Sequence, residues 1–238
     1  MTSNKTAIVT GAQQGIGAGI VEGFLQSGYN VVATSLHASE SLRSTSTLIV
    51  VEGDIRDPET AAKTIQAAIT HFGAIDVLVN NAGIFIAKPF TEFTTDDFNA
   101  LVSVNLLGFL HMTQLVVKQM LKQESGCVIT ISAALADNPI AGVNGSVSMI
   151  TKGGLNTATR HLAIEYAKQG IRFNAVAPGV VNTPLHQQNT EEKLRTRQPM
   201  GSIAEISDIV DAVVYLAHAR QVTGEVLHVD GGAHGGRW

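Results

Sequence analysis

Short runs rich in β-branched residues alternate along this chain with longer segments of helical period, and this alternation strongly constrains the fold. It is typical of βαβ units, in which helices cover both faces of a parallel sheet. The predicted strands are 6–10, 30–34, 48–52, 76–80, 127–131, 171–177 and 225–229. The predicted helices lie near 16–27, 59–72, 96–122, 146–169 and 205–218. The pattern therefore predicts an α/β fold with a doubly wound, seven-stranded parallel sheet.

The length of the chain limits how many domains it can form. Its 238 residues, 45% hydrophobic and 15% charged, suffice for one sizeable α/β core. We therefore expect a single domain over 1–238. One connection, at about 184–200 between Pro184 and Pro199, lacks a strong period. A long connection of this kind inside a domain is often a lid or a substrate-binding loop.

Charge and cysteine content exclude several classes of protein. The net charge of −4 and the absence of any run of five like charges give no basic surface for nucleic acid. The single cysteine, Cys127, lies in an apolar run, which favours burial and provides no disulfide or metal framework. The polar N-terminus does not resemble a signal peptide, and we expect no membrane-spanning segment. These features predict a cytoplasmic protein with a small-molecule substrate and no membrane partner.

Three glycines follow the first predicted strand with G-x3-G-x-G spacing, namely Gly11, Gly15 and Gly17. Glycines at these places allow a tight turn and let the backbone approach a pyrophosphate, which the N-terminus of the next helix would bind. Such a motif alone predicts little more than a turn. Its position between a strand and a helix of an alternating chain favours a Rossmann-like dinucleotide site, and Gln14 and Ile16 belong to the same turn.

The end of the second strand bears on the choice between NAD and NADP. An acidic residue there would accept hydrogen bonds from the ribose hydroxyls of NAD. This chain has Ser35 instead, which favours NADP because nothing repels a 2′-phosphate. A basic residue is also missing, although His37, Ser39 or Arg43 could replace it. An ordinary capped loop with dual cofactor preference stays open as the alternative.

Several motifs in this order resemble the short-chain dehydrogenase/reductase family, and the resemblance covers nearly the whole chain. They are 10-TGAQQGIG-17, 80-NNAG-83, Asn105 and 178-PGVVNTP-184. The resemblance implies an NAD(P)-dependent oxidoreductase. It also implies that Asp54, with Ile55, meets the adenine. The remaining cofactor contacts that it implies are Asn81, Ala82, Gly83, Pro178, Gly179, Val181 and Thr183.

The catalytic groups match the family only in part. In the family a tyrosine exchanges the proton on oxygen, and a lysine four residues later lowers its pKa and holds the nicotinamide ribose. A serine orients the substrate oxygen, and an asparagine extends a water relay. The resemblance assigns these last three roles to Lys152, Ser132 and Asn105. Ser148 occupies the tyrosine position, and Ala133 follows Ser132 where the family usually has a serine pair.

The loss of the phenol leaves the source of the proton open. A serine hydroxyl is a much weaker acid than tyrosine, whose pKa is about 10. Water relayed through Lys152 and Asn105 could supply the proton, and His186 in the substrate loop is another candidate acid. Ser148 and Lys152 also imitate a Ser-x-x-Lys hydrolase motif, but with one residue too many between them.

Three functional hypotheses follow. The leading one is an oxidoreductase acting on a small or hydrophobic carbonyl or alcohol, with a non-standard proton-transfer site. The second is a dinucleotide-binding protein that has lost turnover and acts as a sensor or interaction subunit. The third is a cofactor-assisted isomerase or dehydratase.

The resemblance also predicts the assembly. The helices at 96–122 and 146–169 match those that pair across subunits in the family, and the tail 224–238 resembles its edge-strand interface. We therefore expect a homotetramer, with a dimer as the alternative. Trp238, the only tryptophan, would pack in an interface or against a neighbour's active site.

Overall fold

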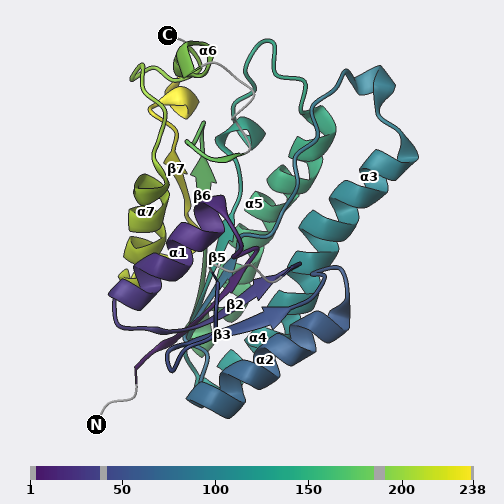
Figure 1. Ribbon diagram of the computed structural model, residues 1–238. Helices are drawn as coiled ribbons and strands as arrows, with labels where there is room; N and C mark the ends of the chain where they lie inside the picture. Colours follow the sequence, from purple (N-terminus) through teal and green to yellow (C-terminus); the bar gives the residue numbers. More distant parts are fainter. Residues whose placement is uncertain (1–3, 38–41, 185–190, 237–238) are drawn as a thin grey trace.

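The computed structural model describes residues 4–37, 42–184 and 191–236. It contains a seven-stranded parallel sheet with the order β3-β2-β1-β4-β5-β6-β7, which confirms the predicted fold class (Figure 1). The strands are β1 Thr6–Thr10, β2 Asn30–Ser35, β3 Leu48–Glu52, β4 Val77–Asn80, β5 Gly126–Ile131, β6 Ile171–Pro178 and β7 Val226–Val229.

Helices cover both faces of the sheet. The helices of the described residues are α1 Gly15–Gln26, α2 Pro58–Phe72, α3 Thr95–Leu101, α4 Gly108–Gln123, α5 Ser146–Tyr166, α6 Glu191–Arg195 and α7 Ile206–His218, of which α6 lies beyond the end of the sheet (Figure 1). Neighbouring strand residues point to opposite faces. Ala7 and Val9 of β1 accordingly pack in the core beneath α1 and α7, whereas Ile8 packs in the core beneath α2 and α4. Figure 1 shows these two helix layers on either side of the sheet.

The strand order reverses between β1 and β4, and this reversal positions the functional site. The chain builds β1, β2 and β3 outward in one direction and then returns to place β4, β5, β6 and β7 in the other. In parallel α/β sheets, ligands bind beyond the carboxyl ends of the strands at such a switch point. The residues that follow β1, β4, β5 and β6 therefore surround the candidate site.

The predicted helix 96–122 is not one continuous α-helix. A π-helical stretch, η2 Val102–Leu107, separates α3 from α4. Together these segments, Thr95–Gln123, are long and apolar enough to cross a membrane by length and composition alone. Core helices of soluble proteins pass the same test. Here Met112, Val116 and Met120 of α4 are fully buried in the core beneath the sheet.

Candidate active site

The turn between β1 and α1 is held tightly against the end of β4. A Cβ on Gly17 would lie 2.2 Å from the carbonyl oxygen of Gly11, so no larger residue fits there. Gly11 has a φ of +64°, and a Cβ on it would lie 2.8 Å from the Cα of Ala82. The Asn81 side chain donates to the carbonyls of Thr10 and Gly11 at 2.9 and 3.0 Å. These contacts fix the backbone path that the glycine motif predicted.

The N-terminus of α1 is left open toward a groove. Gln14 occupies the N-cap position without a side-chain cap, and the first turn contains no acidic residue. The N–H groups of that turn therefore remain available to an anion, and the helix dipole favours one. The adjoining cavity has a volume of about 490 Å³. This chemistry fits the pyrophosphate of a dinucleotide.

Most predicted cofactor residues line this groove. They are Gly11, Gln14, Gly15, Ile16, Gly17, Ser35, Asp54, Ile55, Asn81, Ala82, Gly83 and Thr183. Pro178, Gly179, Val181 and Lys152 line the adjoining cavity described below. His37 is exposed and is absent from both linings, although its carbonyl oxygen accepts a hydrogen bond from Ser35.

The groove contains a cation that sequence reasoning missed. Arg56 lines the groove and forms an ion pair with Asp54. Its hydrogen bonds hold the pKa of the Asp54 carboxyl below the usual value. Ser35 is buried, and its hydroxyl lies 2.8 Å from the His37 carbonyl oxygen and 3.3 Å from Gln13 Oε1. The only signal for Arg56 was its place two residues after Asp54.

Asn105 is buried in the π-helical stretch and connects three elements. Its Oδ1 accepts from the Ile84 N–H at 2.8 Å, and its Nδ2 donates to the Ile84 carbonyl at 3.1 Å and to Thr151 Oγ1 at 2.9 Å. This amide therefore fixes the segment after β4 against α5. A Cβ on Gly83 would lie 3.2 Å from Asn105 Oδ1 and 3.1 Å from Lys152 Nζ, so both groups border the same space.

Lys152 presents its ammonium group at the carboxyl end of β5. Nζ donates to the carbonyl of Ile131 at 2.8 Å. Desolvation disfavours the charged form and lowers the pKa of this lysine to about 8. Lys152 and Ser132 both line the apolar cavity. The Ser132 hydroxyl also lies 3.4 Å from the carbonyl oxygen of Lys152.

Ser148 lies outside the two linings that contain the other site residues. Its side chain is fully buried, and its Oγ donates to the Ile86 carbonyl and accepts from the Ile86 N–H, each at 2.9 Å. The hydroxyl thus fastens the segment after β4 to α5. The next residue, Met149, lines the apolar cavity instead.

The apolar cavity has a volume of about 460 Å³ and shares part of its lining with the groove. Residues that line both are Ile16, Asn81, Gly83, Ile84 and Thr183. Within the described ranges, the lining contains no Asp, Glu, His, Tyr or Cys. Sequence reasoning missed several of the lining residues: Phe85, Leu135, Asn138, Ile140, Val143, Met149 and Arg197. His186, predicted to contact substrate, lies outside the described residues, as does Trp238.

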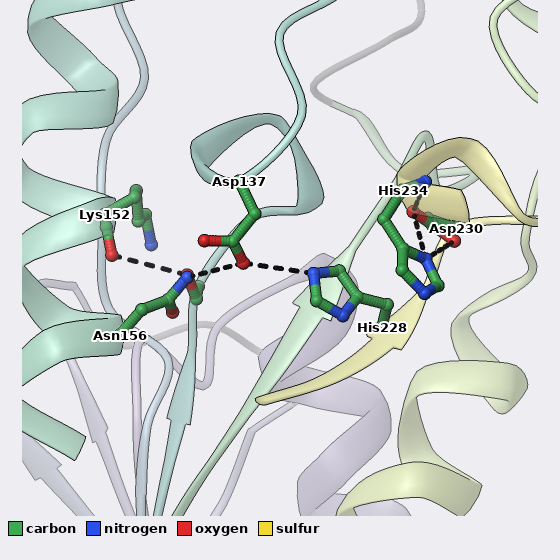
Figure 2. A network of polar contacts seen from close by, with 7 residues as sticks. Asp137, Lys152, Asn156, His228, Asp230 and His234 are labelled. Atoms are coloured by element: carbon green, nitrogen blue, oxygen red, sulfur yellow. Dashed lines mark hydrogen bonds and ion pairs between the residues drawn. The ribbon is translucent and has the colours of Figure 1, made fainter. Parts of the chain in front are cut away.

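A polar network joins two segments that flank this cavity. His228 Nε2 and the Asn156 amide each lie 3.1 Å from Asp137 Oδ2, and His234 pairs with the buried Asp230 (Figure 2). The two histidine rings stack with their centroids 4.0 Å apart. The network connects the loop after β5 to η6 Ala233–Gly235, and Ala134 and Ala233 of these segments line the cavity.

A glycine turn at the sheet's switch point, an open helix N-terminus and an adjoining apolar cavity with a half-buried lysine define a nicotinamide-dependent oxidoreductase site. The chain matches a family model described as enoyl-(acyl carrier protein) reductase over residues 11–234. It belongs to the short-chain dehydrogenase/reductase family and is an NAD(P)-dependent enzyme of that family.

Relatives of known sequence match nearly the full length. The chain is 37% identical to a tropinone reductase homolog from Arabidopsis thaliana, with 95% of this chain and 92% of the relative covered. It is 31% identical to the 3-oxoacyl-[acyl-carrier-protein] reductase FabG of Staphylococcus aureus, with 98% and 100% covered.

Solved structures agree with this assignment. ElxO with NADP bound superposes with a TM-score of 0.92 at 29% identity, covering 98% of this chain and 100% of that one. The 3-ketoacyl-(acyl-carrier-protein) reductase of Brucella melitensis, complexed with NADH, gives a TM-score of 0.90 at 28% identity, covering 98% and 99%.

Proposed function

We propose that this enzyme interconverts a small or hydrophobic carbonyl compound and its alcohol, with a proton-transfer site that uses no tyrosine. The observation that carries this proposal is the shared lining of the dinucleotide groove and the apolar cavity at Gly83, Ile84 and Thr183. A substrate in the cavity would therefore border the part of the groove that the nicotinamide end would occupy. The apolar walls favour a substrate with a hydrophobic body.

The bound nicotinamide supplies or accepts the hydride, and this chain's residues hold it and manage the proton. The N-terminus of α1 would bind the pyrophosphate, while Pro178, Gly179, Val181 and Thr183 would border the nicotinamide end. The hydrogen bond to the Ile131 carbonyl holds the Lys152 amine beside the space that Asn105 and Gly83 border.

Lys152 takes over the proton transfer in this proposal. The Ser148 hydroxyl is occupied by the Ile86 backbone and does not line the cavity. Lys152 lines the cavity, and desolvation lowers the pKa of its ammonium group to about 8. During reduction its ammonium donates a proton to the substrate oxygen, directly or through one water, and the neutral amine is reprotonated from solvent. During oxidation the neutral amine accepts that proton.

NADP is the preferred cofactor in this proposal. Ser35 leaves no carboxylate to repel a 2′-phosphate, and Arg56 offers a cation in the groove. The solved relatives contain both kinds of dinucleotide, since ElxO has NADP bound, an ElxO variant has NADPH bound and the Brucella enzyme is complexed with NADH. The replacement Arg56→Gln should weaken NADPH binding about tenfold and NADH binding much less, as measured by fluorescence titration. Equal losses for both dinucleotides would contradict this role.

A homotetramer is the proposed assembly. Large apolar side chains are exposed on the two segments that the family resemblance assigns to subunit pairing: Leu107 at the end of η2, Leu110 on α4, and Ile150 and Ile164 on α5. Exposure of these apolar side chains to water does not stabilise a single chain, whereas packing against a second copy would bury them.

The experiment that tests the proposed activity combines cofactor binding with turnover. NADP(H) and NADH are titrated first, and carbonyl compounds are then screened with the parent and with Ser148→Tyr. We expect dinucleotide binding and turnover by the parent. Binding with turnover only in Ser148→Tyr would overturn the tyrosine-free mechanism and favour a sensor role. Absence of dinucleotide binding would overturn the proposal as a whole.

A further inference from the structure

The charge on the wall of the apolar cavity is unbalanced. Lys152 and Arg197 line it, and no acidic residue among the described residues does. The chain as a whole has a net charge of −4, so this excess of positive charge is local. Lys152 has a place in the proton transfer and a hydrogen bond to the Ile131 carbonyl. Arg197 has no part in that chemistry.

The backbone around Arg197 is held firmly against the end of β6. The Arg197 N–H donates to the carbonyl of Leu194 at 3.1 Å, and the Leu194 side chain is buried. The buried Gln198 donates from Nε2 to the Val180 carbonyl at 2.8 Å. The buried side chains of Leu194 and Gln198 thus fix the backbone from which Arg197 reaches the cavity wall.

The Arg197 guanidinium itself lacks a partner within the parts of the chain that the structure describes. The residue is half-buried, and its side chain forms no hydrogen bond or ion pair there. A partly desolvated cation beside an apolar surface is costly unless a counter-charge joins it. The planar guanidinium fork matches a carboxylate, to which it can donate two parallel hydrogen bonds.

We propose that Arg197 binds the carboxylate of the substrate, which makes the substrate class an apolar oxo acid and, in the reverse direction, the corresponding hydroxy acid. The carbonyl lies beside Lys152 and Ser132, and the hydrocarbon body contacts the apolar wall formed by Leu135, Ile140 and Val143. This inference rests on the proposed carbonyl reduction, because it assigns the substrate of the same cavity.

Binding of a matched pair of unreactive probes tests the inference without turnover. Octanoate and 1-octanol share an apolar chain, and only octanoate carries a negative charge at pH 7. Each is titrated by calorimetry into the full-length protein, with and without saturating NADP+. The variants are Arg197→Gln, Arg197→Lys and the control Arg195→Gln. Arg195 is exposed and lies outside the cavity lining, so the control removes the same charge two residues away.

We expect Arg197→Gln to weaken octanoate binding 10- to 100-fold and to leave octanol binding within twofold. Arg197→Lys keeps the positive charge but lacks the planar guanidinium fork, so its octanoate affinity should fall less than that of Arg197→Gln. The control should bind octanoate like the parent. The inference is overturned if the parent binds both probes equally well, or if Arg195→Gln loses as much affinity as Arg197→Gln.

The outcome separates this inference from the proposed activity. Dinucleotide binding and reduction of neutral ketones, without preference for octanoate, would overturn only the role of Arg197. Octanoate binding that depends on Arg197, in a protein that binds no dinucleotide, would overturn only the proposed activity. Thermal unfolding of each variant shows whether a loss of binding reflects a loss of fold.

Discussion

At the scale of single residues, Ser148 forms a structural contact that its place in the sequence did not predict. It lies four residues before Lys152, where both side chains share one helix face. Its hydroxyl nevertheless points to the Ile86 backbone, which it both donates to and accepts from. The segment after β4 is thereby fastened to α5.

This geometry predicts a structural effect for Ser148→Ala. The variant removes a buried hydroxyl and leaves the Ile86 N–H and carbonyl without that partner, so the free energy of unfolding should fall by about 1–3 kcal/mol. Turnover by the remaining folded protein should stay within a fewfold of the parent. Chemical denaturation and steady-state kinetics measure both. Ser146→Ala, on the same helix but exposed, is the control and should change neither.

At the scale of elements, the β1–α1 turn should tolerate no side chain at Gly17. A methyl group there would clash with the Gly11 carbonyl and the Asn81 amide. Gly17→Ala should destabilise the protein by about 1–3 kcal/mol and weaken NADPH binding at least tenfold, because the turn must shift. Gly154→Ala is the matched control, since a Cβ at this exposed position of α5 meets no atom within 4 Å. Equal affinity of both variants for NADPH would contradict this role for the turn.

Much of the element-level structure was predictable from the sequence. All seven strands begin and end within one residue of the expected bounds, because apolar β-branched runs between turns mark buried parallel strands. The π-helical stretch was not predicted, since apolar spacing over 96–122 fits one ordinary helix. Within it, Asn105 forms hydrogen bonds with Ile84, 21 residues away in sequence, which helical spacing does not reveal.

The candidate site was predictable to different degrees at its two ends. The dinucleotide groove follows from local turn chemistry, and most of its residues were identified. The cavity wall depends on segments distant in sequence, so Met149, Asn138 and Arg197 gave no local signal. The contact that occupies Ser148 joins residues 62 positions apart and could not be inferred from helical spacing.

At the scale of the whole molecule, the exposed apolar surface of α4 and α5 predicts self-association. Light scattering should give a mass of about 100 kDa, four times the 25.1 kDa of one chain. The double variant Leu110→Glu, Ile164→Glu places charges on both helices and should yield smaller species. Ile164→Val keeps the surface apolar and should retain the parent mass. A monomeric parent would contradict this prediction.

The proposed mechanism requires that Lys152 supplies the proton to the substrate oxygen. The pH dependence of carbonyl reduction tests this requirement most directly. Reduction needs the ammonium form, whose pKa is lowered to about 8. The single-turnover rate should therefore be constant below pH 7 and should fall about tenfold per pH unit well above 8. The arginine of Lys152→Arg stays protonated, so that variant should lose about 10²–10⁴ in rate at pH 7 and show no break near pH 8. A parent rate independent of pH between 7 and 9, or a break near 8 that persists in Lys152→Arg, would contradict proton donation by Lys152.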